Sequence, residues 1–416
     1  MKILWITNIL FPAPCKKLNI EPPVIGGWMY SSAKSLQKMD ADIELAVATV
    51  YRGTELKKFD IDGITYFLLP LKGDKKKYHK SLEPLWQEVV SDFNPDLTHL
   101  HGTEVAHGLA FLKSCPEVNV VVSIQGLISV ISNYYYSGIP KWQILKNITF
   151  KNILIFDNIF QQKKSFYKRG LIEREIIKRS HHVIGRTSWD KAHCLAINPS
   201  INYHFCNETL RDEFYKHKWL YKKCKKHTIF LSQADYPIKG LHKVIEALPY
   251  VLKKYPDTIV YVAGSDIISN KTFKDRLKRG GYGKYIKHLI ASYKLEDKIV
   301  FKGFLDEQAI CNQYLQSNLF VCPSSIENSP NSLGEAQLLG VPCIASYVGG
   351  VPDMMKGSEN NMYRFEETEM LADKICNIFN EKDWDNSYII QKASERHNRE
   401  KNAIQIIRIY NKITSD

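Results

Sequence analysis

The chain has 416 residues, of which 44% are hydrophobic and 24% are charged, and this balance excludes a disordered or fibrous protein. Its length exceeds what one hydrophobic core usually organises, so two domains are expected. The formal net charge of +13 predicts a surface that attracts phosphates or anionic lipids. No nucleic-acid recognition motif accompanies this charge, so a nucleic-acid partner is not expected.

The cysteines and the N-terminal stretch bear on where the protein works. The nine cysteines are scattered and never form a C-x-x-C pair, so neither a disulfide framework nor a zinc site is expected. The opening MKILWITNILFPAP has a short apolar run without a small-residue cleavage site, and it predicts a buried first strand rather than a signal peptide. No apolar run reaches the length of a membrane span. These features predict a cytoplasmic protein and leave open peripheral attachment to the inner face of the membrane.

The N-terminal half alternates short apolar runs with helical patterns. The predicted strands are KILWIT, IELAVATV, GITYFLLP, LTHLH, VNVVVSI and HHVIGR, and a helix is predicted over Gly27–Lys38. Runs that are buried on both faces and joined by helices are typical of a doubly wound parallel sheet. Residues 1–206 are therefore predicted to form a first Rossmann-like domain.

The segment from Ser129 to Arg179 interrupts this pattern. It contains NYYYSGIPKW, ITFKNILIF and QQKKSFYKRG, an aromatic and basic mixture in a place where a sheet-to-helix connection is usually short. Two interpretations stay open. The segment is either an inserted helical pair that closes an edge of the core, or a surface that docks on a membrane or an acceptor.

A second series of strands follows the polar stretch KHKWLYKKCKKH. Its members are TIFLSQ, DTIVYVAG, KIVFKGF, LFVCPS and PCIASYVGG, and KGLHKVIEALPYVLKKYP between them has apolar residues at helical spacing. The sequence predicts a linker at 207–226 and a second Rossmann-like domain at 227–382. The charged helices predicted at 383–416 are expected to cross back to the first domain.

The stretch PSSIENSPNSLGEAQLLGVPCIASYVGG, residues 323–350, follows a predicted strand. Open α/β sheets bind ligands beyond the carboxyl ends of their strands, and a loop of small residues before a helix suits a phosphate. Glu327 and Glu335 supply carboxylates that accept hydrogen bonds from the hydroxyls of a ribose and a sugar. An alternative stays open for Glu335, because Ser332 to Glu335 also fits a capping box of a helix that begins at Leu333.

Glu327, seven intervening residues and Glu335 resemble the E-x7-E motif of the family-4 glycosyltransferases, which are retaining enzymes of the GT-B fold. GGWMYSSAKSL resembles the family's N-terminal glycine loop, PDLTHLHG its D-x-x-H-x-H strand end, and IKGLHKVIEAL its Lys-Gly turn and helix. VYVAGSD and VFKGFLDEQAICNQYLQSNLFVCPS fit the later strands. The resemblance is weakest over 129–179 and after Met362. It implies an α/β protein with two Rossmann-like, doubly wound domains that face each other across a cleft.

The resemblance also implies a role for each matching residue. Glu335 would bind the nucleotide ribose, Glu327 would approach the donor sugar, and Lys239 would neutralise the diphosphate leaving group. His101 would face the donor sugar from the first domain. For Lys239 and His101, a solvated lysine and a structural histidine are the alternatives. The other implied donor-binding residues are Gly26, Gly27, Gly264, Gly303, Phe304, Asn331, Ser332 and Leu333.

The sequence departs from the family pattern at two places. Many members carry an arginine five or six residues before the lysine, where this chain has Ala234 and Gln233. Arg186 or Arg211 would then supply the second diphosphate cation, with a salt bridge as the alternative for each. Gln125 stands where the family often has a histidine, and its amide can bind a hydroxyl or an acceptor but cannot act as a general base.

The resemblance implies a retaining, hexosyltransferase-type enzyme that takes its sugar from a nucleotide-diphosphate donor, with a UDP-sugar expected. The implied acceptor is a glycan or lipid-linked oligosaccharide of bacterial surface polysaccharide synthesis, and the basic charge adds an anionic membrane surface as a partner. The resemblance implies that no cofactor and no metal are needed, and no Asp-x-Asp motif or paired His or Cys ligand cluster in the sequence contradicts this. Two alternatives stay open: a nucleotide-sugar epimerase of the same fold, and a non-catalytic subunit that binds a nucleotide or a glycan.

Overall fold

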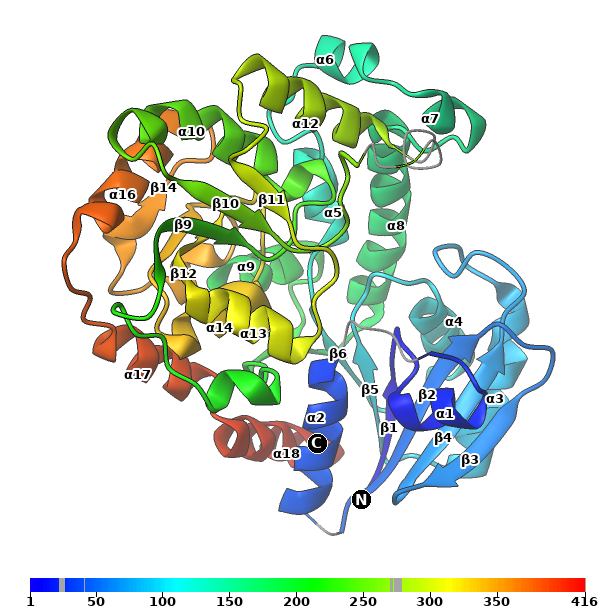
Figure 1. The fold of residues 1–416 in the computed structure, drawn as a ribbon. Coiled ribbons are helices and arrows are strands. Elements are labelled where there is room, and N and C mark those ends of the chain that lie inside the picture. The colour runs from blue at the N-terminus through cyan, green and yellow to red at the C-terminus, as the bar shows by residue number, and fades with distance from the viewer. Residues whose placement is uncertain (22–26, 41, 270–271, 273–278, 416) are drawn as a thin grey trace. The chain divides into compact units, whose positions relative to one another are not determined.

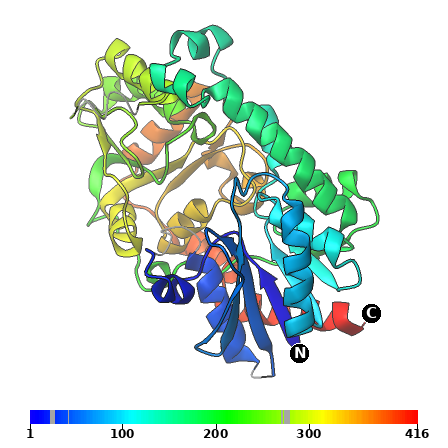
Figure 2. The same ribbon diagram turned by 90° about the vertical axis from the view of Figure 1, so that its right-hand side faces the viewer.

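The chain of the computed structural model folds into two compact units. The first comprises Met1–Val130, Phe166–Thr209 and Arg396–Asp416, and the second comprises Ile131–Ser165 and Leu210–Glu395 (Figures 1 and 2). Each unit contains its own parallel sheet, so the predicted α/β fold with two Rossmann-like, doubly wound domains is confirmed. The structure describes residues 1–21, 27–40, 42–269, 272 and 279–415.

The two units divide the chain differently from the predicted boundaries. Most of the insert, expected in the first domain, belongs to the second unit from Ile131 to Ser165. The predicted linker joins the second unit from Leu210 onward, because Phe214 and Trp219 are buried in its core. Of the C-terminal helical region, only the part from Arg396 onward returns to the first unit.

In the part of the chain that the structure describes, the first unit has an eight-stranded sheet of order β3-β4-β2-β1-β5-β6-β7-β8. Neighbouring strands are parallel except β3 and β4, which form a hairpin. Its two loop residues, Asp62 and Gly63, both have positive φ, as the tight turn between twisted strands requires. The strands are β1 (Lys2–Ile6), β2 (Glu44–Tyr51), β3 (Lys57–Ile61), β4 (Ile64–Pro70), β5 (Leu97–His101), β6 (Val120–Ser123), β7 (His182–Gly185) and β8 (Asn202–Phe205).

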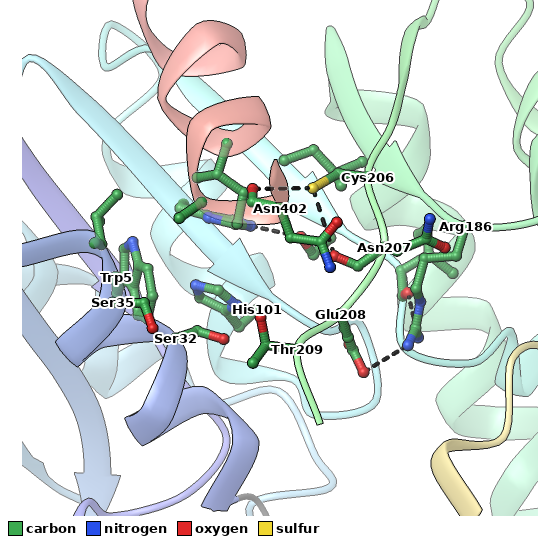
Figure 3. A pocket seen from close by; sticks show the side chains of 17 residues that line it. Trp5, Ser32, Ser35, His101, Arg186, Cys206, Asn207, Glu208, Thr209 and Asn402 are labelled. Carbon is green, nitrogen blue, oxygen red and sulfur yellow. Dashed lines mark hydrogen bonds and ion pairs between the residues drawn. The ribbon is translucent and has the colours of Figure 1, made fainter. Parts of the chain in front are cut away.

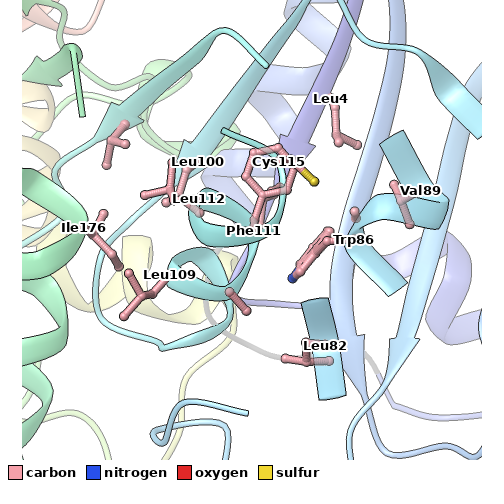
Figure 4. Close-up of a cluster of buried hydrophobic side chains, with 14 of the residues drawn as sticks. Leu4, Leu82, Trp86, Val89, Leu100, Leu109, Phe111, Leu112, Cys115 and Ile176 are labelled. Atoms are coloured by element: carbon pink, nitrogen blue, oxygen red, sulfur yellow. The ribbon is translucent and has the colours of Figure 1, made fainter. Parts of the chain in front are cut away.

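Helices cover both faces of this sheet because successive strand residues point to opposite sides. Leu4 of β1 packs in a cluster with Trp86 of α3 and Phe111 of α4 (Figure 4). Trp5, the next residue, packs in a second cluster with Tyr410 of α18. The helices are α1 (Pro12–Lys17), α2 (Gly27–Met39), η1 (Lys80–Leu82), α3 (Glu83–Phe93), α4 (His107–Ser114), α5 (Ile128–Ile131), the C-terminal part of α8 (Ile159–Arg179), α9 (Ser188–Ile197) and α18 (Arg399–Ser415).

Over its described residues, the second unit has a six-stranded, wholly parallel sheet of order β11-β10-β9-β12-β13-β14. Its central strand β12 is buried at every position, which is why LFVCPS reads as a continuous apolar run. The strands are β9 (Lys225–Leu231), β10 (Ile259–Val262), β11 (Ile299–Phe301), β12 (Ser317–Cys322), β13 (Cys343–Ser346) and β14 (Met362–Tyr363).

The helix α10 illustrates how this second sheet is covered. Leu241, Val244, Ile245 and Leu248 recur at helical spacing, and all four are buried, as the sequence pattern predicts. The insert adds its own helices α6 and α7. The helices of this unit are η2 (Ser132–Tyr134), α6 (Lys141–Lys146), α7 (Phe150–Leu154), η3 (Asp212–Tyr215), η4 (Pro237–Lys239), α10 (Leu241–Lys254), α12 (Gly281–Ser292), α13 (Glu307–Gln316), α14 (Asn331–Leu339), α15 (Val351–Met354), η5 (Glu359–Asn361), α16 (Thr368–Asn380) and α17 (Ser387–Arg396).

Candidate functional site

An ion pair lies in the second unit beyond the carboxyl end of β12. Lys239 Nζ is 2.6 Å from Glu327 Oε1, and Ser324 Oγ donates a hydrogen bond to the same oxygen at 2.8 Å. Burial alone would lower the pKa of Lys239, but the Glu327 carboxylate outweighs it and raises that pKa above its ordinary value. Lys239 is therefore not a solvated side chain. It is a fixed, fully charged cation with little access to water.

Backbone geometry places Lys239 at this point. The turn η4 ends at Gly240, which has a φ of +72°, and a Cβ there would lie 1.7 Å from the carbonyl oxygen of Pro323. The Ser325 amide donates to the Ile238 carbonyl at 2.8 Å and ties the same turn to the loop after β12. Only glycine allows so close an approach of the two loops.

Glu335 lies inside a helix and not at its cap. α14 begins at Asn331, two residues earlier than the capping box requires, and it has no side-chain cap. Both carboxylate oxygens of Glu335 accept hydrogen bonds from Arg211, from Nε and from Nη2, each at 2.8 Å. Burial raises the pKa of Glu335, and the Arg211 guanidinium opposes that rise. The capping-box interpretation is thus wrong, and Arg211 forms the salt bridge that its alternative interpretation named.

The first turn of α14 has polar groups that no protein atom among the described residues satisfies. The amides of Leu333 and Gly334 donate to the Pro330 carbonyl, whereas the amides of Asn331 and Ser332 stand at the helix N-terminus, where no intrahelical acceptor exists. Asn331 Oδ1 is buried, and no atom of the described residues donates a hydrogen bond to it. The two open amides are suited to an anionic oxygen, and the unsatisfied Asn331 Oδ1, which only accepts hydrogen bonds, is suited to a hydroxyl donor.

The loops after β10 and β11 meet at a pair of glycines. The Gly264 amide donates to the Gly303 carbonyl at 2.9 Å, and Phe304 beside them is 75% exposed. Asp235, which follows β9, accepts a hydrogen bond from the Ser265 amide at 3.1 Å, and burial raises its pKa. Asp235 was not among the site residues predicted from the sequence. Its position just beyond a predicted strand end could have identified it, because open α/β sheets bind ligands there.

A cavity of about 460 Å³ adjoins these loops within the second unit. It is lined by the loop after β9, by residues beyond β10 and by the insert, which contributes Asn152 and Asp157. This volume is within the range of small-ligand sites. No sequence pattern predicts the cavity, because its walls come from segments that are far apart along the chain.

His101 ends β5 in the first unit. Its ring stacks on His99, with 3.8 Å between centroids, and packs against Trp5 at 4.4 Å. Burial lowers the pKa of His101 to about 3, so the imidazole is neutral at physiological pH. Together with Ser32 and Ser35 of α2 it lines a cavity of about 40 Å³, which has room for water but not for a sugar (Figure 3).

Arg186 and Gln125 lie near this cavity. Arg186 Nη1 is 2.6 Å from Glu208 Oε2, and both side chains are largely buried. Arg186 Nη2 also donates to the carbonyl oxygens of Ile124 and Gln125, at 3.0 and 2.9 Å. The guanidinium is therefore engaged within the first unit (Figure 3). Gly27 begins α2, and Gly26 lies outside the described residues.

A polar cluster that was not expected from the sequence lies at the ends of β1 and β5. Glu104 Oε2 accepts a hydrogen bond from Asn8 Nδ2 at 3.0 Å, and Asn8 Oδ1 is 3.2 Å from His107 Nε2. Burial raises the pKa of Glu104 to about 7, and the nearby Glu173 contributes to this rise. Asn8 and Glu104 follow predicted strands, so their positions beyond the strand ends could have identified them as candidate site residues.

Metal ligands and membrane spans were both sought among the described residues. No group of three His, Cys, Asp or Glu side chains within those residues is placed to hold a metal ion. Within the same residues, every helix is too short or too polar to cross a bilayer.

Comparison with known proteins assigns the second half of the chain to a family. Residues 212–405 match the family model "Glycosyl transferases group 1". The chain carries a group 1 glycosyltransferase domain. This group 1 domain contains Lys239, Glu327 and Glu335, the three residues of the motifs that carried the resemblance.

Relatives with known names agree with this assignment. Over 367 residues the chain is 24% identical to YtcC of Bacillus subtilis (strain 168), named as a putative glycosyltransferase, with 86% of this chain and 77% of YtcC covered. Over 158 residues it is 28% identical to spore coat protein SA of the same organism. That match spans 37% of this chain and only 39% of the spore coat protein.

Solved structures establish the fold. The chain resembles sucrose-phosphate synthase from Thermosynechococcus elongatus with a TM-score of 0.67 at 14% identity, covering 100% of this chain and 99% of that one. It resembles Anabaena Alr3699/HepE, solved with UDP and glucose, with a TM-score of 0.63 at 16% identity and 99% coverage of both chains. The GT-B fold implied by the sequence motifs is thereby confirmed.

Proposed function

We propose that this protein is a retaining glycosyltransferase that moves a sugar from a UDP-sugar to a glycan or lipid-linked oligosaccharide. The observation that carries this proposal is the pairing of Lys239 with Glu327 close in sequence to the unsatisfied N-terminus of α14, within the group 1 domain. A fixed cation, a carboxylate and open amides are what a diphosphate and a sugar hydroxyl require.

The donor is proposed to be a nucleotide sugar with a uracil base. Support comes from a neighbour of the same fold, Anabaena HepE, which was solved with UDP and glucose. The cavity of about 460 Å³ beside Asp235 is large enough for part of such a ligand. Glu335 would bind the ribose with the carboxylate lone pairs that Arg211 leaves free, since a carboxylate has about four acceptor sites.

In the proposed mechanism, Lys239 stabilises the negative charge that develops on the departing diphosphate. Its ammonium has three N–H donors, so one can stay on Glu327 while another reaches a phosphate oxygen. Retention would follow from attack on the face that the diphosphate leaves, with the leaving phosphate accepting the proton of the acceptor hydroxyl. Such a reaction needs positioning and charge stabilisation more than an enzymatic nucleophile. The mechanism assigns no step to His101, because burial keeps its imidazole neutral and the cavity that it lines has no room for a sugar.

The acceptor is proposed to belong to the assembly of bacterial surface polysaccharide. The relative named as a spore coat protein supports a role at the cell surface, and the net charge of +13 suits an acceptor presented at an anionic membrane. No metal is proposed to take part.

A non-catalytic subunit is the second candidate. Arg186 pairs with Glu208 and Arg211 with Glu335, as Lys239 does with Glu327, so each of the three candidate phosphate-binding cations is partly neutralised by a carboxylate. A protein that binds a nucleotide without cleaving it would tolerate this reduced positive charge, because no leaving diphosphate has to be stabilised. An epimerase would need no acceptor.

Thermal unfolding of the full chain with UDP, GDP, ADP and their glucose conjugates tests the donor. A nucleotide at a hundredfold excess over its Kd adds about 2.7 kcal/mol to stability, which raises the Tm by roughly 5–10 °C. We expect this shift for UDP and UDP-glucose, its loss in Lys239→Ala and Glu335→Gln, and its retention in the matched control Lys222→Ala. No shift with any nucleotide would refute the donor site.

Turnover then separates the candidates. We expect consumption of UDP-glucose that depends on an added glycan and yields a product of retained anomeric configuration. Conversion of the UDP-sugar to its epimer without an acceptor would identify an epimerase, and binding without turnover would favour the non-catalytic subunit.

A further inference from the structure

Two short helices of the insert present an exposed apolar surface, which we call the insert patch. It is formed by α6, by α7 and by the turn that follows α7, all within the second unit (Figure 1). Its large apolar side chains are 55–76% exposed and lie together on neighbouring segments, whereas exposed apolar side chains of a monomeric protein are usually scattered singly. They are Trp142, Leu145, Phe150, Ile153, Leu154, Ile155 and Phe156.

The polarity of α7 is inverted relative to a surface helix of a soluble protein. Its buried residue is Asn152, which is 2% exposed, whereas Phe150, Ile153 and Leu154 face outward. The Asn152 side chain accepts a hydrogen bond from the Thr149 amide at 3.2 Å and donates to the Asp157 carbonyl at 2.8 Å. Surface helices normally bury their apolar stripe and expose their polar one. Packing within the unit therefore does not explain the apolar side of α7.

The insert patch is held in place by contacts inside the second unit. Lys284 Nζ donates to the Lys146 carbonyl, and Thr149 Oγ1 donates to the Arg279 carbonyl, each at 3.1 Å. Gly281 lies so close that a Cβ there would be 3.0 Å from Asn152 Oδ1. These contacts preform the surface, so little conformational entropy is lost when a partner covers it.

The charged side chains within the insert patch are all basic, and Asp157 directly follows the patch. From Ile131 to Phe156 the chain has Lys141, Lys146 and Lys151 and no acidic residue. Lys141 and Lys146 are exposed beside the apolar side chains. We propose that the insert patch docks on the surface of an anionic lipid bilayer, with its apolar side chains at the acyl boundary and its lysines at the headgroups.

This lipid surface fits the insert patch better than a second copy of the chain does. Protein interface cores are depleted in lysine, whereas lysine beside tryptophan and aliphatic residues is typical of interfacial helices. Lysine stems extend along apolar surface while their ammonium groups stay at the phosphates. Docking of this kind does not rest on the proposed sugar transfer, and its test uses no donor or acceptor.

Vesicle flotation of the full chain tests the inference. We expect binding to vesicles that contain phosphatidylglycerol, weak binding to vesicles of phosphatidylcholine alone, and release as salt screens the lysines. The variant Phe150→Ser/Ile153→Ser/Leu154→Ser should bind roughly a hundredfold more weakly or worse, because three large apolar side chains lose their burial. The variant Lys141→Gln/Lys146→Gln should bind roughly 30-fold more weakly, about fivefold for each lysine.

Matched variants elsewhere in the second unit serve as controls. Leu220→Ser/Met370→Ser removes exposed apolar side chains, and Lys222→Gln/Lys223→Gln removes exposed lysines; both should bind vesicles like the unaltered chain. An unchanged melting temperature shows that a variant is folded. Brominated lipids should quench the fluorescence of the unaltered chain more than that of Trp142→Phe, because Trp142 lies in the insert patch.

Three results would overturn the inference. They are no binding to anionic vesicles, binding that the insert-patch variants leave unchanged, and a dimer in size-exclusion chromatography that only those variants dissociate. The last result would assign the insert patch to a second copy of this chain.

Discussion

At the scale of single residues, Arg211 and Glu335 form a buried pair with two parallel hydrogen bonds. We predict that Arg211→Met lowers the stability of the second unit by about 3 kcal/mol, because it leaves a buried carboxylate without its partner. For a unit of this size the Tm should fall by roughly 6–12 °C, measured by calorimetry of the full chain. The double variant Arg211→Met/Glu335→Leu should recover much of that loss. A single variant as stable as the unaltered chain would show that the pair is solvated in solution.

Glu104 is the residue whose titration should be visible in the stability of the protein. Its pKa rises from 4.5 to about 7 on burial, so the folded protein holds a proton that the unfolded chain releases. The resulting stabilisation is fully present below pH 4.5 and is lost as the pH rises through about 7. We predict that, relative to Glu104→Gln, the unaltered chain loses about 2–3 kcal/mol between these pH values. The prediction would be contradicted if the free energies of unfolding of the two proteins changed equally with pH across this range.

At the scale of secondary-structure elements, the turn that holds Lys239 depends on Gly240. We predict that Gly240→Ala costs more than about 3 kcal/mol and abolishes the nucleotide-induced rise in Tm, because a methyl group cannot fit 1.7 Å from the Pro323 carbonyl. Gly303→Ala is the control. Gly303 has a similar φ of +74°, but a Cβ there meets no atom within 4 Å, so only about 1 kcal/mol of backbone strain is expected. Equal losses of stability in the two variants would show that the positive φ, and not the close approach of the Pro323 carbonyl, causes the destabilisation.

Among the described residues, the strands inside the two sheets were all predicted, whereas of the four edge strands only β11 was. All the predicted strands of both sheets are present, because a strand that is covered on both faces shows as an apolar run. The missed strands β3, β8 and β14 lie at sheet edges. β3 and β8 are partly exposed, so their apolar residues alternate with polar ones, while β14 has only two residues. The start of α14 at Asn331 was missed because a Ser-x-x-Glu pattern also occurs inside helices.

At the scale of the whole molecule, the last helix belongs to the unit that contains the first strand. Tyr410 Oη accepts a hydrogen bond from Trp5 Nε1 at 3.0 Å and lies 2.5 Å from His99 Nδ1. We predict that Tyr410→Phe destabilises the first unit by about 1–3 kcal/mol, because two buried polar groups lose their partner. Hydrogen exchange should show faster exchange of the amides in β1 and β5 and unchanged amides in β9 and β12. A change confined to the second unit would contradict this assignment of α18.

The sequence alone predicted the α/β class, the two sheets and the order of the motifs around Lys239, Glu327 and Glu335. These features are local, since apolar periodicity and short motifs are properties of neighbouring residues. The partners of the charged groups became known from the folded chain alone. Arg211 and Glu335 lie 124 residues apart and Lys239 and Glu327 lie 88 apart, and no local pattern encodes such pairs. The unit to which the insert belongs was settled in the same way, by contacts between segments distant along the chain.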